Sequence, residues 1–315
     1  MFSSDAPSLL GWIAAHTNRI ELGAGAMQIP ARSPAMTAMT VATLDTICAG
    51  RFRLGLGISG PQVSEGWHGV RFSRPLERTR EYVDIVRLAL RKESVGGLEY
   101  AGRHYTLPLP DGPGKALRLA MRPVRREVPI YPAAVGPKNL ELAGEIAEGW
   151  LAVFFDPEFG ADHLTHLRIG RQRAGLDLSG FDVVAGVPLV VGDDVAACAD
   201  PVRHYTAYFV GGAGTREVNF YNWLAVRMGY GPEAREVQDR YLAGNMAGAA
   251  AAVPAELVDT TALLGPVDRV ADRLQAYTEA GMTTLSVLLF PRDVADGVQT
   301  LRAVAGALDK SGIAE

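Results

Sequence analysis

The segment AAVGPKNLE carries residue types that suit a phosphate group. A strand is expected to end at Val135, and Gly136 is followed by a proline that opens a helix. The first turn of a helix has amide N–H groups without an intrahelical acceptor and a positive dipole end, so it attracts anions. Lys138 adds a positive charge, and Asn139 adds a hydrogen-bonding side chain. The alternative is that the Gly-Pro pair only begins a helix.

Two glycine-rich stretches also end predicted strands. GLGISG, residues 55–60, could cradle a phosphate or a ring, but it does not match the dinucleotide-binding fingerprint with its acidic residue after the next strand. In GAGA, residues 23–26, the small side chains would let a planar ring approach the backbone closely. Both stretches are also compatible with ordinary packing of small residues in a sheet.

Six histidines are available as acids or bases. His163 and His166 are three residues apart, a spacing that could form a metal pair, but no third ligand accompanies them, so both are expected on a solvent-facing helix and no metal site is expected. The loop SEGWHGV brings Glu65 and His68 together in sequence. His68 either hydrogen-bonds within its loop or contacts a substrate.

The composition excludes several classes of partner. The chain has 315 residues, of which 48% are hydrophobic, which is enough for a large core. Its net charge is −4 without any block of like charges, so nucleic acid is not an expected partner. No apolar stretch approaches the roughly 20 residues that span a bilayer. The two cysteines, Cys48 and Cys198, cannot build a disulfide framework or a metal cluster, and we expect a reducing cytoplasm.

The elements around these residues alternate between short apolar strands and amphipathic helices, which favours a parallel sheet wrapped by helices. Ser33 and Pro34 are typical of a helix start. We expect one domain over residues 1–315, with a hairpin-containing insertion at about 97–127 and a helical insertion at about 212–252. Six strands are predicted, at residues 20–27, 51–58, 128–136, 149–155, 181–194 and 283–290.

Three segments carry a family resemblance that runs through nearly the whole chain: RIELGAGAMQIPARSPAMTAMTVATLDTICAGRFRLGLGISG, AAVGPKNLELAGEIAEGW and GPVDRVADRLQAYTEAGMTTL. Together they resemble the luciferase-like monooxygenase superfamily, and specifically its coenzyme F420-dependent oxidoreductase branch. Members of this family are TIM barrels that bind a flavin or the deazaflavin F420 at the C-terminal ends of the strands. The resemblance therefore implies an α/β fold of the (β/α)8 type.

The resemblance also places the strand at residues 20–27 as the third of the barrel. The first strand, first helix and second strand would take roughly 35 residues, which this sequence does not contain ahead of that strand. We therefore expect an incomplete barrel with six strands and two exposed edges. Such edges favour self-association, and a homodimer is expected.

The resemblance implies which residues hold the cofactor. It predicts a non-prolyl cis peptide between Gly25 and Ala26, and contacts to the cofactor's phosphate tail from the AAVGPKNLE segment. It places His68 and Glu65 on the catalytic face, although the acid or base that the family usually carries at the end of the second strand is missing. The implied cofactor-binding residues are Gly25, Ala26, Ile58, Ser59, Ser64, Val135, Gly136, Lys138 and Asn139.

The helical insertion leaves two roles open. Arg216, Asn219, Tyr221 and Asn222 could shape a pocket for the substrate or the cofactor tail. Phe220 and Trp223 could instead form a dimer surface, because aromatic residues are enriched at interfaces. The sequence does not separate these roles.

Three functions fit these observations. The first, which we favour, is an F420-dependent oxidoreductase that moves a hydride to or from a small organic substrate. The second is an FMN-dependent monooxygenase of the same superfamily. The third is a non-catalytic, truncated barrel that binds a ligand or dimerises. Sugar phosphates are disfavoured as substrates, because that class of the family has an acidic residue after the glycine motif, whereas ISGPQVSE offers Gly60 and Gln62 there, with Glu65 further on.

Overall fold

The computed structural model describes residues 4–91, 97–121 and 123–313 of the 315-residue chain. Its contacts fall into two compact units. Unit 1 holds residues 1–134, 141–150 and 170–176, and unit 2 holds residues 135–140, 151–169 and 177–315. The division runs through α5 (Pro137–Ile146), β7 (Gly149–Val153) and α6 (Gly160–Arg173). The single domain expected over residues 1–315 stays a prediction.

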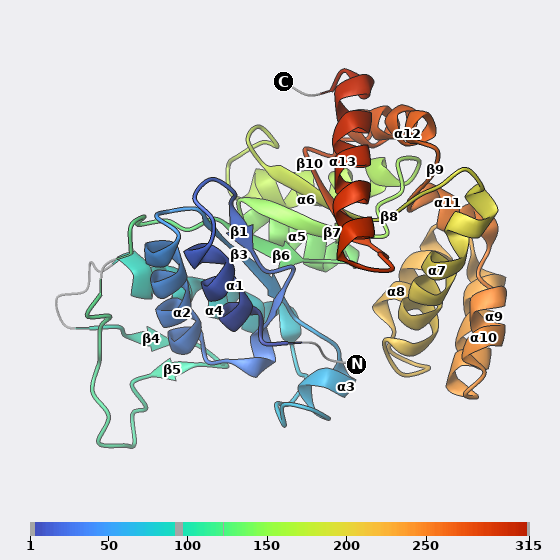
Figure 1. The fold of residues 1–315 in the computed structure, drawn as a ribbon. Helices are drawn as coiled ribbons and strands as arrows, with labels where there is room; N and C mark the ends of the chain where they lie inside the picture. Colours follow the sequence, from blue (N-terminus) through green and yellow to red (C-terminus); the bar gives the residue numbers. More distant parts are fainter. Residues whose placement is uncertain (1–3, 92–96, 122, 314–315) are drawn as a thin grey trace. The chain divides into compact units, whose positions relative to one another are not determined.

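Unit 1 is built on parallel strands with β3 at their centre. β3 pairs in parallel with β1, β2 and β6. Helices follow the strands in the order that a parallel sheet requires, because each parallel connection needs a crossover (Figure 1). The elements are α1 (Ala6–Ala15), β1 (Leu22–Gly23), β2 (Met27–Gln28), the 3₁₀ turn Ile29–Ala31, α2 (Pro34–Ile47), β3 (Phe52–Gly57), α3 (Pro61–Ser64), α4 (Pro75–Arg91), β4 (Tyr100–Ala101), β5 (Thr106–Leu107) and β6 (Ile130–Ala133).

The core of unit 1 includes the three large apolar side chains of β3. Phe52, Leu54 and Leu56 are all buried, and the same cluster includes apolar side chains of α1, α2 and α4. The predicted start of α2 is confirmed, since the Ser33 side chain accepts a hydrogen bond from the amide of Met36 at 3.1 Å.

The predicted hairpin in the 97–127 insertion is also confirmed, as the antiparallel ribbon β4–β5. Its turn is tied to α4 by Glu81, which is 7% exposed. The Glu81 carboxylate accepts hydrogen bonds from the amides of Arg103, His104 and Tyr105 at 2.8 to 3.1 Å. A buried carboxylate satisfied in this way holds the insertion against the helix.

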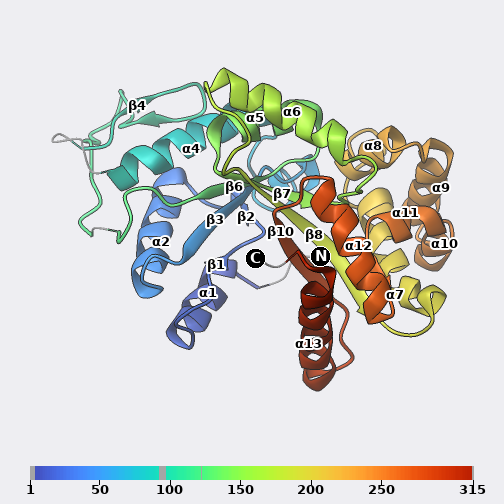
Figure 2. The ribbon, with the colours of Figure 1, turned by 90° about the horizontal axis from the view of Figure 1, so that it is seen from above.

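Unit 2 contains β8, which pairs in parallel with both β9 and β10. Helices α12 and α13 pack beside each other, as both views show (Figures 1 and 2). The elements are β8 (Asp182–Val191), α7 (Val195–Ala207), a π-helical turn (Tyr208–Gly212), α8 (Phe220–Arg227), α9 (Gly231–Leu242), α10 (Met246–Ala251), α11 (Ala255–Thr260), β9 (Leu263–Gly265), α12 (Val267–Glu279), β10 (Thr284–Leu289) and α13 (Val294–Ser311).

The structure confirms all six predicted strands, divides one of them and adds a short one. The strand expected at residues 20–27 is divided into β1 and β2. The short strand β9 was not predicted, because three residues are too few to show a period. In the described part of the chain, no helix is both long and apolar enough to cross a bilayer.

Candidate functional site

The segment between β1 and β2 has the backbone that the resemblance implied. The peptide bond between Gly25 and Ala26 is cis, as predicted. Gly25 is exposed and Ala26 is half-buried, and β2 begins immediately afterwards. A Cβ added at Gly57 would lie 3.7 Å from the Ala26 methyl, an ordinary contact distance, so the end of β3 lies directly beside this segment.

The end of β3 carries a second unusual backbone. Ser59 has φ +60°, a left-handed conformation that a residue with a side chain rarely adopts. Ile58, directly before it, packs with its partly buried side chain against the core of unit 1. Outliers of this kind cluster at binding sites, which supports a functional reading of GLGISG.

The loop after β3 is held together by its own polar side chains. The Ser64 hydroxyl is buried and donates to the carbonyl of Val70 at 2.6 Å. Glu65 accepts from the amide of Phe72 at 2.9 Å and lies 3.7 Å from the Arg71 guanidinium. Glu65 is therefore engaged in closing its own loop.

His68 connects this loop to β2. Its Nε2 lies 2.8 Å from the Oε1 of Gln28, which is 40 residues away in sequence. With the Gln28 amide in this orientation, the Nε2 of His68 is the donor, which leaves Nδ1 as an acceptor. The structure thus gives His68 a defined tautomer.

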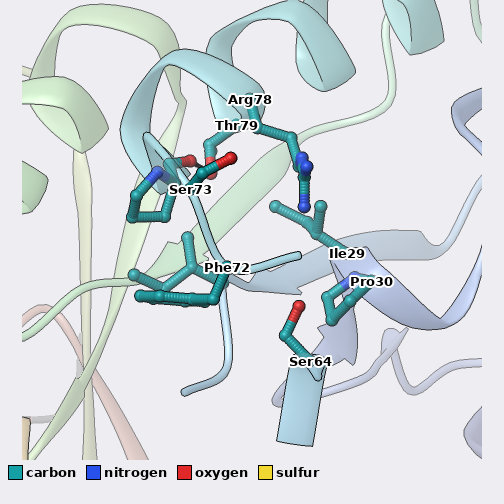
Figure 3. Close-up of a pocket in the computed structure, with 9 residues that line it drawn as sticks. Ile29, Pro30, Ser64, Phe72, Ser73, Arg78 and Thr79 are labelled. Atoms are coloured by element: carbon teal, nitrogen blue, oxygen red, sulfur yellow. Dashed lines mark hydrogen bonds between the residues drawn. The ribbon is translucent and has the colours of Figure 1, made fainter. Parts of the chain in front are cut away.

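A pocket opens in unit 1 beside these residues. The space around its lining is about 240 Å³ with open solvent included, but the enclosed part has room for only about one water molecule. Figure 3 shows the Arg78 guanidinium and the Ser64 hydroxyl directed toward one another from different walls. The pocket is lined by Ile29, Pro30, Ile58, Ser64, Phe72, Ser73, Pro75, Arg78 and Thr79.

The AAVGPKNLE segment contributes a separate site, at the start of α5 in unit 2. The helix begins at Pro137, as predicted, and the carbonyl of Gly136 accepts from the amides of Asn139 and Leu140 at 3.0 Å. A Cβ placed on Gly136 would meet no heavy atom within 4 Å, so there is open space at the positive end of the helix. Lys138 is exposed and Asn139 is buried.

The structure corrects the expectation for His163. The sequence placed it on a solvent-facing helix, but it is 1% exposed and its ring lies 5.1 Å from that of Phe159 and 6.2 Å from that of Phe155. Burial lowers the pKa of His163 to about 4. Among the described residues no group of three or more His, Cys, Asp or Glu side chains could hold a metal ion.

The insertion's asparagines have structural partners. Asn219 caps α8 and also donates to the carbonyls of Phe209 and Val210 at 3.0 Å. Asn222 donates to the carbonyls of Val210 and Ala234 at 3.1 and 2.8 Å. Both side chains hold the π-helical turn in place. Of the other two candidates, Arg216 pairs with Asp239, and Tyr221 lines a small hollow of its own unit.

Sequence reasoning missed two residues of this region. Gln28 lies after the small-residue stretch and was not considered, because its contact to His68 is made only in the fold. Arg78, in the first turn of α4, lines the pocket, and no local pattern in the sequence distinguishes it from the other charged residues of that helix.

Comparisons with known proteins identify the family. The model of the luciferase-like monooxygenase family matches residues 1–284. A Mycobacterium tuberculosis protein named as a coenzyme F420-dependent oxidoreductase is 40% identical over 292 residues, covering 91% of this chain and 84% of that protein. A 5,10-methylenetetrahydromethanopterin reductase of Archaeoglobus fulgidus is 28% identical, covering 88% of this chain and 79% of the reductase.

Solved structures support the same fold. The coenzyme F420-dependent tetrahydromethanopterin reductase of Methanopyrus kandleri has a TM-score of 0.78 at 24% identity, covering 96% of this chain and 85% of the reductase. At this identity the likeness establishes the α/β, TIM-barrel type of fold only. The family model and the relatives together show that the chain belongs to the luciferase-like monooxygenase family, in its branch of coenzyme F420-dependent oxidoreductases.

Proposed function

We propose that this protein is an F420-dependent oxidoreductase that transfers a hydride between the deazaflavin and a small organic substrate. The observation that carries the proposal is the free space at Gly136, at the start of α5, in a chain 40% identical to a protein named as an F420-dependent oxidoreductase. F420, when bound, supplies the hydride chemistry, and the protein supplies binding and orientation.

The start of α5 fits the cofactor's phosphate. Open space in front of Gly136 lets an anion approach the backbone, which a larger residue would prevent. In this proposal Val135 and Gly136 offer backbone, Lys138 offers charge, and Asn139 completes the first turn of the helix.

The ring contacts are proposed for unit 1. Gly25 and Ala26 present backbone without bulky side chains, and Ile58 and Ser59 end β3 in a left-handed turn. The Ser64 hydroxyl donates its hydrogen bond to the Val70 carbonyl, so only its oxygen lone pairs and its carbon atoms are available to a ligand.

His68 is the better of the two candidates for the proton that accompanies hydride transfer. When a substrate alcohol or amine loses a hydride from carbon, it also loses a proton from oxygen or nitrogen, and a base must accept it. His68 has Nδ1 as an acceptor because Gln28 occupies its Nε2. Glu65 already closes its loop through Phe72.

The experiment that tests the cofactor assignment is a fluorescence titration of wild type and Gly136→Ala with F420, with its deazaflavin core lacking the phosphate tail, and with FMN. Gly306→Ala is the control, because Gly306 lies in α13 and also has open space around its Cβ position. We expect Gly136→Ala to weaken F420 binding about tenfold, the effect of one lost charge-assisted hydrogen bond. Its unfolding midpoint and its affinity for the tail-less core should stay unchanged.

Two results would count against the proposal. Saturable binding of FMN without binding of F420 would assign the protein to the flavin-dependent monooxygenases instead. If Gly136→Ala loses the same affinity for F420 and for the tail-less core, the phosphate tail does not bind at Gly136. The homodimer and the cytoplasmic location stay predictions, which light scattering and cell fractionation can test.

A further inference from the structure

Two helices of unit 1 lack the charged outer face that a helix in contact with water normally has. α1 contains no charged residue, and the one charged residue of α2, Asp45, is buried and paired with Arg125. By contrast, α4 of the same unit carries charged residues in every turn. A helix that is apolar on all sides is typical of a buried position, so the outer sides of α1 and α2 are suited to being covered.

Large apolar side chains project from these outer sides. Trp12 is 65% exposed and Met39 is 50% exposed, and three further side chains are exposed to a similar degree. Half-exposed side chains of this size present on the order of 100 Å² each, so together they match the largest apolar patches of ordinary monomers, roughly 300–600 Å². We call this surface the α1–α2 face, and its apolar members are Leu9, Trp12, Met36, Met39 and Ile47.

The threonines of α2 add to the apolar character of the same face. The hydroxyls of Thr40, Thr43 and Thr46 donate to backbone carbonyls four residues earlier in the helix, at 2.8 to 3.0 Å. Each hydroxyl proton is therefore used within α2, and covering these residues leaves no unpaired donor. The face can lose its contact with water without the usual cost of burying polar groups.

The exposed residues of the two helices border one common seam. α1 and α2 pack beside each other, as both views show (Figures 1 and 2). A Cβ added at Gly11 would lie 3.9 Å from the Leu44 side chain, so these two residues face each other across the seam. Trp12 follows Gly11, and Thr40 and Ile47 lie one turn to either side of Leu44. The apolar side chains thus form a continuous surface.

We infer that the α1–α2 face is the contact surface of a homodimer, in which it packs against the same face of a second copy of this chain. A two-fold interface brings a surface against itself, and a face without charges is complementary to itself because no like charges meet. Tryptophan and methionine are among the residues enriched in interfaces, whereas lysine, glutamate and aspartate are depleted. The apolar members with the polar rim around them approach the roughly 800 Å² per partner that a stable interface buries.

This surface differs from the two that the sequence suggested for self-association, which were the open sheet edges and the aromatic residues Phe220 and Trp223. It is also independent of the proposed hydride transfer, since it lies on outer helices and includes none of the proposed cofactor contacts. Failure of F420 binding and failure of dimerisation are therefore separate results.

The test compares one lysine substitution on each of the three surfaces. The variants are Met39→Lys on α2, Trp223→Lys on α8 and Leu301→Lys on α13, whose original side chains are 50%, 47% and 47% exposed. The mass of each full-length variant is measured by light scattering and sedimentation equilibrium over a concentration series, and circular dichroism checks that it is folded. We expect a dimeric wild type, unchanged dimers in Trp223→Lys and Leu301→Lys, and a dissociation constant raised about a hundredfold or more in Met39→Lys, because symmetry buries two ammonium groups per dimer.

Three results would overturn the inference. They are a wild type that stays monomeric throughout the concentration series, a Met39→Lys dimer as tight as the wild type, and dissociation caused by Trp223→Lys or Leu301→Lys instead.

A second measurement applies if Met39→Lys does not fold. Trp12 should lose its contact with water in the dimer, so dilution of the wild type should move tryptophan emission to longer wavelength, and Trp12→Phe should abolish most of that change. A shift of the same size in Trp12→Phe would mean that Trp12 lies outside the contact.

Discussion

Replacing Arg125 by methionine should destabilise unit 1 by leaving a buried charge without its partner. Asp45 on α2 has a side chain with 0% exposure, and its carboxylate accepts from the Nε and Nη2 of Arg125 at 3.0 and 2.6 Å and from its backbone amide at 3.1 Å. The same guanidinium donates to the carbonyl of Phe52. The pair thus connects α2 to the beginning of β3, the strand that positions Ile58 and Ser59.

The magnitude follows from what remains after the substitution. Removing one partner of a buried ion pair costs about 3–5 kcal/mol. The amide of residue 125 still donates to Asp45 in the variant, and Arg125 itself is 28% exposed, so we expect the lower end, about 3 kcal/mol. For a chain of 315 residues that corresponds to a fall in Tm of about 4–5 °C.

The assay is urea unfolding followed by tryptophan fluorescence and by circular dichroism, with Arg87→Met as the control. The Arg87 side chain is 29% exposed, close to the 28% of Arg125, and it also pairs with a carboxylate at 2.6 Å. Its partner, Glu148, however, has a side chain that is 49% exposed. An exposed pair contributes about 0–1 kcal/mol, so Arg87→Met should have a small effect. Adding Asp45→Asn to Arg125→Met should recover part of the loss. If the two single variants lose the same stability, burial of Asp45 is not the cause.

Three further predictions concern a buried histidine, a buried tryptophan and a tautomer. Burial lowers the pKa of His163 from 6.5 to about 4, so the unfolded chain binds more protons than the folded chain between these pH values, and the free energy of unfolding should be highest above pH 6.5 and fall by about 3 kcal/mol toward pH 4. Urea unfolding of His163→Phe should show a flatter pH dependence, and an unchanged slope would contradict this. Trp150, 1% exposed, donates from Nε1 to the carbonyl of Ala134 at 2.8 Å, so Trp150→Phe should cost about 1–3 kcal/mol in urea unfolding; a neutral variant would mean that the carbonyl finds another donor. NMR of the His68 ring nitrogens should find the proton on Nε2 in the wild type and a mixture of tautomers in Gln28→Leu. A proton on Nδ1 in the wild type would show that the Gln28 side-chain amide is flipped.

The sequence predicted much of the local structure, because local structure depends on neighbouring residues. Ser33 before a proline marked the start of α2, and the Gly-Pro pair at 136–137 marked the start of α5. Apolar runs followed by amphipathic helices identified the parallel strands and their order along the chain. The cis peptide at Gly25 and Ala26 came from the family resemblance.

The contacts that define the candidate site were decided by the tertiary structure alone. Gln28 and His68 are 40 residues apart, and Asp45 and Arg125 are 80 apart, so no local pattern relates them. The sequence around His163 is typical of a surface helix, and His163 becomes a core residue only because Phe155 and Phe159 pack around it. Periodicity shows that a helix has two faces, but burial depends on which neighbours cover each face, and that is settled only when distant segments come together.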